Sequence, residues 1–201
     1  MQNKEEELYI IGAGVSGLIA AYELEREGYW PIIIEQTDDV GGRVKTIHEK
    51  GYALDLGFQV LLTAYPLANQ YLDMDKLQLS RLESGALIYA NGRSSLIGDP
   101  LRNWKVLRPT LLADVGSLGD KLKILQLNLK LKNKSLEAIF ESPERTTQEY
   151  LVELGFSSKI IERFFKPFFA GIFLEPDLKT SSRMFEFVYK MFGEGYAAIP
   201  K

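Results

Sequence analysis

Three glycines near the N-terminus have the spacing that lets a protein hold a dinucleotide by its pyrophosphate. Gly12, Gly14 and Gly17 form a G-x-G-x-x-G motif. The first glycine permits a tight turn, the second lets the backbone approach the phosphates, and the third lets the next helix pack closely. The motif predicts that the cofactor binds along Gly12, Ala13, Gly14, Val15, Ser16 and Gly17.

The segments around the glycines match the elements that such a site requires. The apolar run Leu8–Ile11 is typical of a buried parallel strand, and Val15–Glu27 is expected to form a helix that stops at Gly28. A second strand is expected at Pro31–Ile34. The order predicts a Rossmann-like βαβ unit whose helix N-terminus faces the phosphates. The alternative is a glycine-rich turn with a structural role only.

An acidic residue closes the second predicted strand. Glu35 stands 18 residues after Gly17, where a carboxylate can accept hydrogen bonds from a ribose hydroxyl. The same negative charge would repel a 2′-phosphate, so an adenosine without that phosphate is favoured.

A second glycine pair, with an arginine, follows in Val40-Gly41-Gly42-Arg43. Bare backbone again allows close approach, and a guanidinium offers a planar donor fork to phosphate oxygens. The alternative for Arg43 is a solvated loop cation. Together with the first motif and Glu35, this segment resembles the N-terminus of the flavin-containing amine oxidase and phytoene desaturase superfamily.

The resemblance implies FAD as the cofactor, with Gly41, Gly42 and Arg43 near its pyrophosphate. The segment Asp55–Val60 resembles the part of those proteins that runs along the flavin, so Gly57, Phe58 and Gln59 are expected flavin neighbours. The resemblance covers nearly the whole chain, but only the N-terminal portion of the family's architecture.

Composition excludes several functions. The chain has 201 residues, of which 46% are hydrophobic, and a formal net charge of −3, so nothing indicates a nucleic-acid partner. It has no cysteine, which excludes disulfides and thiolate chemistry. No metal site is predicted, and the single histidine, His48, is expected on a surface strand. The acidic start MQNKEEE differs from a signal peptide, so a cytoplasmic location is expected, with peripheral membrane contact as a further possibility.

The fold expected is α/β: a Rossmann-like FAD-binding unit with a parallel sheet, plus an inserted, mainly helical α+β substrate domain. The domains expected are 1–75 (FAD-binding), 76–195 (substrate or cap) and 196–201 (the start of a return to the FAD domain, the rest being absent). Hairpins are predicted at Val44–Leu56 and around Asn91-Gly92. A short helix is predicted at Ala64–Met74 and a strand at Leu77–Leu82.

Two segments of this domain suggest surfaces. Asp99–Thr110 is expected to be a basic, aromatic connecting loop, usually solvated but able to touch a membrane or an anionic substrate. Gly119–Lys134 fits a strand by alternation but a helix by length and composition, and its leucine stripe and lysines suit either a membrane-surface helix or an ordinary surface helix.

The C-terminal third is expected to be helical and aromatic. Thr146 and Glu149 form a capping box, Ser157 caps a helix that Pro167 kinks, and another helix begins near Ser181. Residues 164–196 hold ten of the chain's 23 aromatic residues, expected mainly in the core and able to line an apolar pocket: Phe164, Phe165, Phe168, Phe169, Phe173, Phe185, Phe187, Tyr189, Phe192 and Tyr196.

These features predict an FAD-dependent oxidoreductase that moves a hydride or electrons from an apolar or amine substrate to flavin. No catalytic side chain and no oligomeric state can be named. Two alternatives remain open: a nicotinamide-dependent oxidoreductase built on the same βαβ unit, and a truncated dinucleotide-binding fragment without activity.

Overall fold

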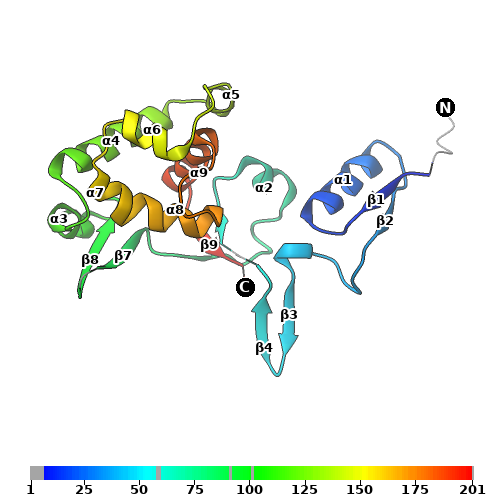
Figure 1. Ribbon diagram of the computed structural model, residues 1–201. Coiled ribbons are helices and arrows are strands. Elements are labelled where there is room, and N and C mark those ends of the chain that lie inside the picture. Colours follow the sequence, from blue (N-terminus) through cyan, green and yellow to red (C-terminus); the bar gives the residue numbers. More distant parts are fainter. Residues whose placement is uncertain (1–6, 58–59, 91, 101, 201) are drawn as a thin grey trace.

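The computed structural model describes residues 7–57, 60–90, 92–100 and 102–200, and it has two lobes joined by a narrower middle (Figure 1). The N-terminal lobe begins with the βαβ unit: β1 (Tyr9–Ile11), α1 (Val15–Arg26) and β2 (Ile32–Ile34). The two strands are parallel, with Tyr9 opposite Ile32 and Ile11 opposite Ile34. The predicted strand, glycine turn, helix and strand are therefore present. Within the described residues, the predicted parallel sheet consists of this one pair.

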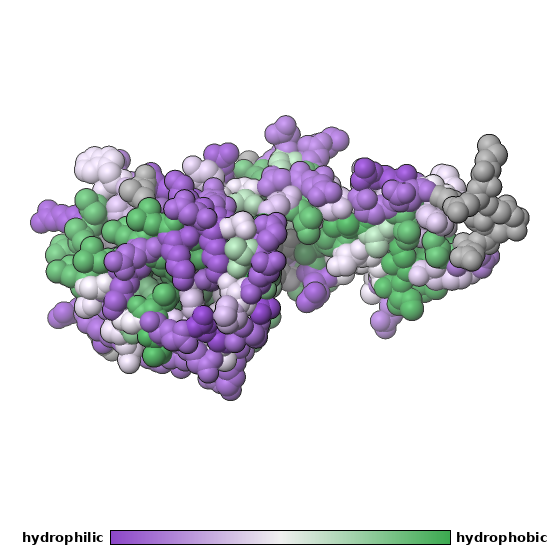
Figure 2. All heavy atoms as spheres, turned by 90° about the horizontal axis from the view of Figure 1, so that it is seen from above, coloured by the Kyte–Doolittle hydropathy of each residue, from purple (hydrophilic) through white to green (hydrophobic). Residues whose placement is uncertain are grey.

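The prediction that Leu8–Ile11 is a buried strand is wrong for this structure. Ile11 is 90% exposed, and Ile32 and Ile34 are about half exposed. The reason is that among the described residues β1 has one neighbouring strand, and α1 packs on one face only. Figure 2 shows hydrophobic residues on the surface of both lobes.

A short 3-10 turn, η1 (Gly42–Val44), leads from this unit into an antiparallel hairpin of β3 (Thr46–Glu49) and β4 (Tyr52–Asp55). His48 lies on β3 and is exposed, as expected. The predicted helix at Ala64–Met74 is shorter in the structure, where α2 spans Pro66–Tyr71. Its proline stands in the first turn, where its missing N–H removes no hydrogen bond.

Three short strands from distant parts of the chain form one antiparallel sheet: β5 (Leu61–Leu62), β9 (Ala197–Ile199) and β6 (Ser80–Arg81), in that order. The predicted strand Leu77–Leu82 is thus reduced to two residues, because β9 offers only a short edge. Strand β9, at the end of the chain, therefore lies between β5, which precedes residue 75, and β6, which follows it. The domain boundaries drawn from the sequence remain a prediction.

The second lobe contains the hairpin of β7 (Gly85–Ala90) and β8 (Arg93–Gly98), which the Asn91-Gly92 pair predicted. Its other elements are helical: η2 (Trp104–Val106), α3 (Leu107–Leu112), α4 (Leu118–Lys132), α5 (Leu136–Phe140), α6 (Thr147–Glu153), α7 (Ser158–Ile160), η3 (Ile161–Phe165), α8 (Lys166–Phe173) and α9 (Ser182–Glu194).

The connecting loop predicted at Asp99–Thr110 is wrong, since η2 and α3 occupy most of it. The side chain of Asn103 accepts a hydrogen bond from the Lys105 N–H and caps η2, while Val106 is buried. For Gly119–Lys134, the choice of helix over strand is confirmed by α4.

Helix starts follow the predicted caps. The side chains of Thr146 and Glu149 form the predicted capping box of α6, and Ser157 caps α7. Near Pro167, where the sequence predicts a kink, the structure has η3, a π turn that ends at Phe165, two residues before the proline. Because proline has no N–H to bond the carbonyl four residues earlier, the preceding turn widens.

The core lies in the second lobe, where α9 packs against α4, α5 and α6. Its fully buried large side chains include Phe165, Phe169, Phe185, Leu131, Ile139 and Leu151. In the part of the chain that the structure describes, no helix is long and apolar enough to cross a bilayer.

Candidate cofactor site

The glycine turn after β1 has the tight geometry that the motif predicts. Gly12 has a positive φ of 96° and donates its N–H to the carbonyl of Ile34, at 2.7 Å. A Cβ on Gly17 would stand 2.0 Å from the carbonyl oxygen of Gly12. Only glycine fits there, so α1 starts in close contact with the end of β1.

Glu35 lies at the end of β2, beside this turn. Its Oε2 accepts the backbone N–H of Ala13 at 2.7 Å, and its Oε1 accepts the N–H and hydroxyl of Thr37 at 2.9 and 3.0 Å. These hydrogen bonds, the one from Ala13 above all, lower the pKa of Glu35 to about 2. The carboxylate is therefore ionised at neutral pH and has lone pairs left for a ribose hydroxyl.

The second glycine loop packs directly against the first. The N–H of Gly41 donates to the carbonyl of Ala13 at 2.9 Å, and Gly14 and Gly41 form an isolated parallel bridge. A Cβ on Gly42 would stand 3.1 Å from the Cα of Gly14. Gly41 and Gly42 both have positive φ, of 112° and 58°. Two loops of bare backbone thus meet at the N-terminus of α1.

This meeting point fits a pyrophosphate. Helix α1 begins at Val15 and Ser16, and its N-cap Gly14 has no side chain to satisfy the first amides. Those amides and the helix dipole favour an anion. A β-carbon at Gly42 would fill the space against Gly14 of the opposite loop, so the residue type and the geometry both suit FAD.

Arg43 follows the pair on η1 and is exposed. It has no ion pair with any residue that the structure describes. A Cβ on Gly57 would stand 2.2 Å from the carbonyl oxygen of Arg43, so glycine is required for the chain after β4 to pass this close. Phe58 and Gln59, the other expected flavin neighbours, lie outside the described residues.

The structure therefore brings together the predicted residues of the two glycine loops, Glu35, Arg43 and Gly57. Sequence reasoning missed Thr37, which holds the Glu35 carboxylate through two hydrogen bonds. A threonine two residues after a carboxylate is a recognisable signal, because its N–H and hydroxyl reach back to that side chain.

A largely apolar pocket of about 610 Å³ lies in the second lobe. We call it the apolar pocket; its aromatic wall is formed by Phe164, Phe168, Phe169, Tyr189 and Phe192. Burial raises the pKa of Tyr189, which keeps its hydroxyl neutral. The aromatic C-terminal third thus has both expected roles, since Phe165 and Phe185 are core residues while others line the pocket.

One arginine holds the end of α9 beside this pocket. Arg102 donates to the carbonyls of Gly193 and Gly195, and its guanidinium lies 5.2 Å from the ring centre of Tyr196. It therefore fixes the segment between α9 and β9 that forms part of the pocket wall.

A βαβ unit in which two glycine loops pack against each other, with an acidic residue at the end of β2, defines a dinucleotide-binding flavoprotein. The chain belongs to the flavin-containing amine oxidoreductase family, whose sequence profile matches residues 15–200. The resemblance noted from the sequence is thus confirmed, and FAD is the cofactor of this class.

Among its relatives are oxidases of a plant and of a snake. Protoporphyrinogen oxidase 2 of Arabidopsis thaliana is 26% identical over 166 residues, which is 81% of this chain and 31% of that protein. An L-amino-acid oxidase of Crotalus adamanteus is 35% identical over 154 residues, or 73% and 30%. The chain therefore spans about a third of the length of these relatives.

Solved structures share the fold. A putrescine oxidase has a TM-score of 0.65 and 19% identity, covering 96% of this chain and 45% of its own. An oxidoreductase from Methanosarcina mazei has a TM-score of 0.63 and 20% identity, covering 98% and 46%. The amine oxidase type of α/β fold is thus established for the described residues.

Proposed function

We propose that this protein is an FAD-dependent oxidoreductase whose flavin takes a hydride or electrons from an apolar or amine substrate. The observation that supports this most is the contact between the two glycine loops, Gly14 against Gly42, beside the N-terminus of α1. A nicotinamide enzyme on the same βαβ unit would give Gly41-Gly42-Arg43 no role.

The chain's own residues would bind and orient the cofactor. The first amides of α1 and the Arg43 guanidinium would bind the pyrophosphate oxygens, and Glu35 would accept from the ribose hydroxyls. Gly57 would let the backbone run close to the flavin. Bound FAD supplies the redox chemistry itself.

The apolar pocket is the proposed substrate site. Its wall is mainly aliphatic and aromatic, which favours a substrate with a large apolar surface and excludes water around it. The relatives named above oxidise a porphyrinogen and L-amino acids, by their names, and these differ in size and charge. For this chain, the apolar wall of the pocket favours a substrate of low polarity.

The experiment that tests the proposal is a titration of the purified chain with FAD, FMN and NAD, followed by flavin fluorescence and calorimetry. We expect saturable binding of FAD, weaker binding of FMN, which lacks the adenosine half, and no binding of NAD. In Arg43→Ala we expect at least about tenfold weaker FAD binding, since a hydrogen bond to a charged group is lost. A chain that binds no FAD, or an Arg43→Ala variant that binds it unchanged, contradicts the proposal.

We also propose peripheral membrane contact of a cytoplasmic protein. Four leucines on one face of α4 are exposed: Leu118, Leu122, Leu125 and Leu129. The other leucines of this helix are buried in the core. Trp104 on η2 is also exposed, at 78%. Lysines on the same helix would face anionic headgroups. We expect the protein to sediment with phosphatidylserine vesicles at low salt, and Leu122→Ser/Leu129→Ser to reduce this; no sedimentation contradicts the proposal.

A further inference from the structure

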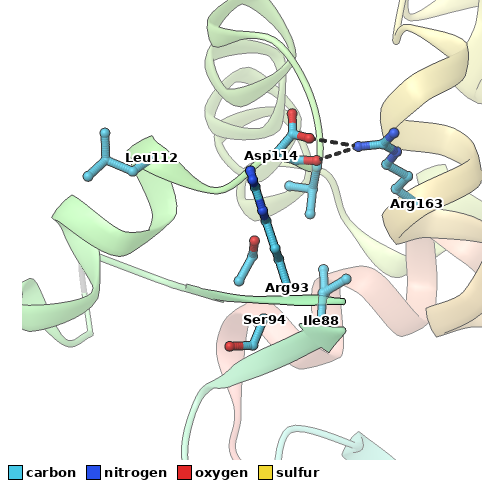
Figure 3. A pocket seen from close by; sticks show the side chains of 8 residues that line it. Ile88, Arg93, Ser94, Leu112, Asp114 and Arg163 are labelled. Atoms are coloured by element: carbon cyan, nitrogen blue, oxygen red, sulfur yellow. Dashed lines mark hydrogen bonds and ion pairs between the residues drawn. The ribbon is translucent and has the colours of Figure 1, made fainter. Parts of the chain in front are cut away.

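A second pocket, of about 500 Å³, lies where the β7–β8 hairpin, the end of α3 and η3 meet (Figure 3). We call it the cationic pocket. Its polar wall is formed by Arg93, Ser94, Ser95, Asp114 and Arg163. It shares nothing with the glycine loops of the cofactor site.

The single acid of this wall is neutralised by cations. Both the Oδ2 and the backbone carbonyl of Asp114 accept from Arg163, each at 2.9 Å. Asp114 Oδ1 accepts from Lys159, and the two cations, Lys159 first, lower the pKa of Asp114. Arg93 and Arg163 line the pocket with one carboxylate, and Lys159 outside the lining also pairs with that carboxylate, so the pocket keeps an excess of positive charge.

Arg93 supplies the donors that are not already in use. It begins β8, and its side chain extends into the pocket toward Asp114 (Figure 3). Its side chain makes no hydrogen bond or ion pair with any residue that the structure describes. Ser95, two residues later on the strand, shares the face of β8 with Arg93 and lines the same wall, whereas the Ser94 side chain points away from Arg93 (Figure 3). A guanidinium fork with a serine on the same strand face suits the oxygens of phosphate or carboxylate.

The cationic pocket and the apolar pocket adjoin each other. Val115 lines both, and η3 contributes Arg163 to one and Phe164 to the other. The hairpin does the same along one face, with Ile97 in the apolar pocket and Ser95, two residues earlier, in the cationic one. π turns such as η3 are frequent at functional sites.

We propose that the cationic pocket binds an oxyanion, a phosphate or carboxylate group, with Arg93 as its principal ligand. The group belongs either to a free anion or to the end of a ligand whose apolar body lies in the apolar pocket. The binding site itself does not depend on FAD or on the proposed reaction.

The test measures binding of inorganic phosphate and of octanoate to the purified chain by calorimetry, at low and high salt. We expect saturable binding at millimolar ligand that weakens with salt. Arg93→Gln should weaken the affinity for whichever of the two ligands binds at least about tenfold. Arg93→Lys should weaken it less, because lysine keeps the positive charge but lacks the planar pair of donors. The Arg93 side chain has no partner among the described residues, so its replacement leaves no buried group of that part of the chain unpaired.

Arg108→Gln is the matched control, because Arg108 is an exposed arginine on α3 outside both pockets. A further variant, Leu111→Ser, alters only the apolar pocket. If Leu111→Ser weakens octanoate and leaves phosphate unchanged, the site receives the end of an apolar ligand; if it changes neither, the site takes a free anion. Absence of saturable binding by both ligands, or equal affinities in Arg93→Gln, Arg108→Gln and wild type, would overturn the proposal.

Discussion

The backbone N–H of Ala13 donates a 2.7 Å hydrogen bond to Oε2 of Glu35, which joins the glycine turn to the end of β2. This bond fixes the ionised carboxylate beside the proposed ribose position. It also makes the local structure depend on pH, because this bond, together with those from Thr37, lowers the pKa of Glu35 to about 2.

Glu35 should therefore contribute to acid unfolding. Its folded pKa is lower than the unfolded value, so its contribution to stability is complete above about pH 4.3 and is lost as pH falls toward 2. Glu35→Gln lacks this contribution. We expect the difference in urea midpoint between wild type and Glu35→Gln to shrink from pH 7 to pH 2.5. A difference that stays constant over that range contradicts the argument.

Asp120 should stabilise the second lobe more than other helix caps do. It is buried and accepts from the N–H and hydroxyl of both Ser117 and Ser157, so one carboxylate caps α4 and α7. Burial alone would raise its pKa, but the bonds from Ser157 and Ser117 outweigh it and lower the value to about 2. Asp120→Ala should lower the free energy of unfolding by about 2–4 kcal/mol.

The matched control is Glu149→Ala, which removes the exposed capping box of α6. It should cost only about 1 kcal/mol. Equal losses for the two variants in urea denaturation would show that Asp120 acts as an ordinary cap.

A buried charge network links the turn after α4 with α6 and α9. Glu186 accepts hydrogen bonds from the Tyr150 hydroxyl and from Lys134 Nζ, and the bond from Lys134 measures 2.5 Å. Burial, together with the hydrogen bond between Tyr150 and Glu186, raises the pKa of Tyr150. Lys134→Met would leave the buried carboxylate without its close cation and should cost about 3–5 kcal/mol in unfolding free energy.

The double variant Lys134→Met/Glu186→Met should recover most of that loss, because no uncompensated charge remains. Lys130→Met is the comparison variant. Lys130 is half exposed, lies 4.0 Å from Glu186 and donates to the Tyr150 hydroxyl at 3.2 Å, so its loss removes an exposed cation and one weak hydrogen bond and should cost only about 1 kcal/mol. A double variant no more stable than Lys134→Met would rule out this explanation.

Local signals in the sequence predicted the elements that local chemistry determines. The glycine turn, the β7–β8 hairpin and the caps at Ser157 and Thr146 depend on residues within a few positions of one another. The contact of Glu35 with the first glycine loop could also be predicted, because the strand–helix–strand order places the end of β2 beside the end of β1.

Features that depend on distant partners could not be predicted. Strand β6 is short because it pairs with β9, over a hundred residues later. The exposure of Ile11 depends on which neighbours its sheet has. The cationic pocket joins Arg93, Asp114 and Arg163, whose spacing in the sequence carries no signal. Helices η2 and α3 were missed because Pro100 and Pro109 suggested a loop, although a proline is tolerated in a first helical turn.

The central claim is that bare backbone at Gly14 seats the FAD pyrophosphate, and FAD titration of Gly14→Ala tests it most directly. Gly14 has extended backbone, and an added Cβ would meet its nearest atom, the Gly42 Cα, at an ordinary 4.0 Å, so the fold should tolerate alanine. We predict an unchanged melting temperature without FAD and at least about tenfold weaker FAD binding. Gly119→Ala on α4 should bind FAD as wild type does. FAD affinity in Gly14→Ala equal to that of wild type would contradict the account.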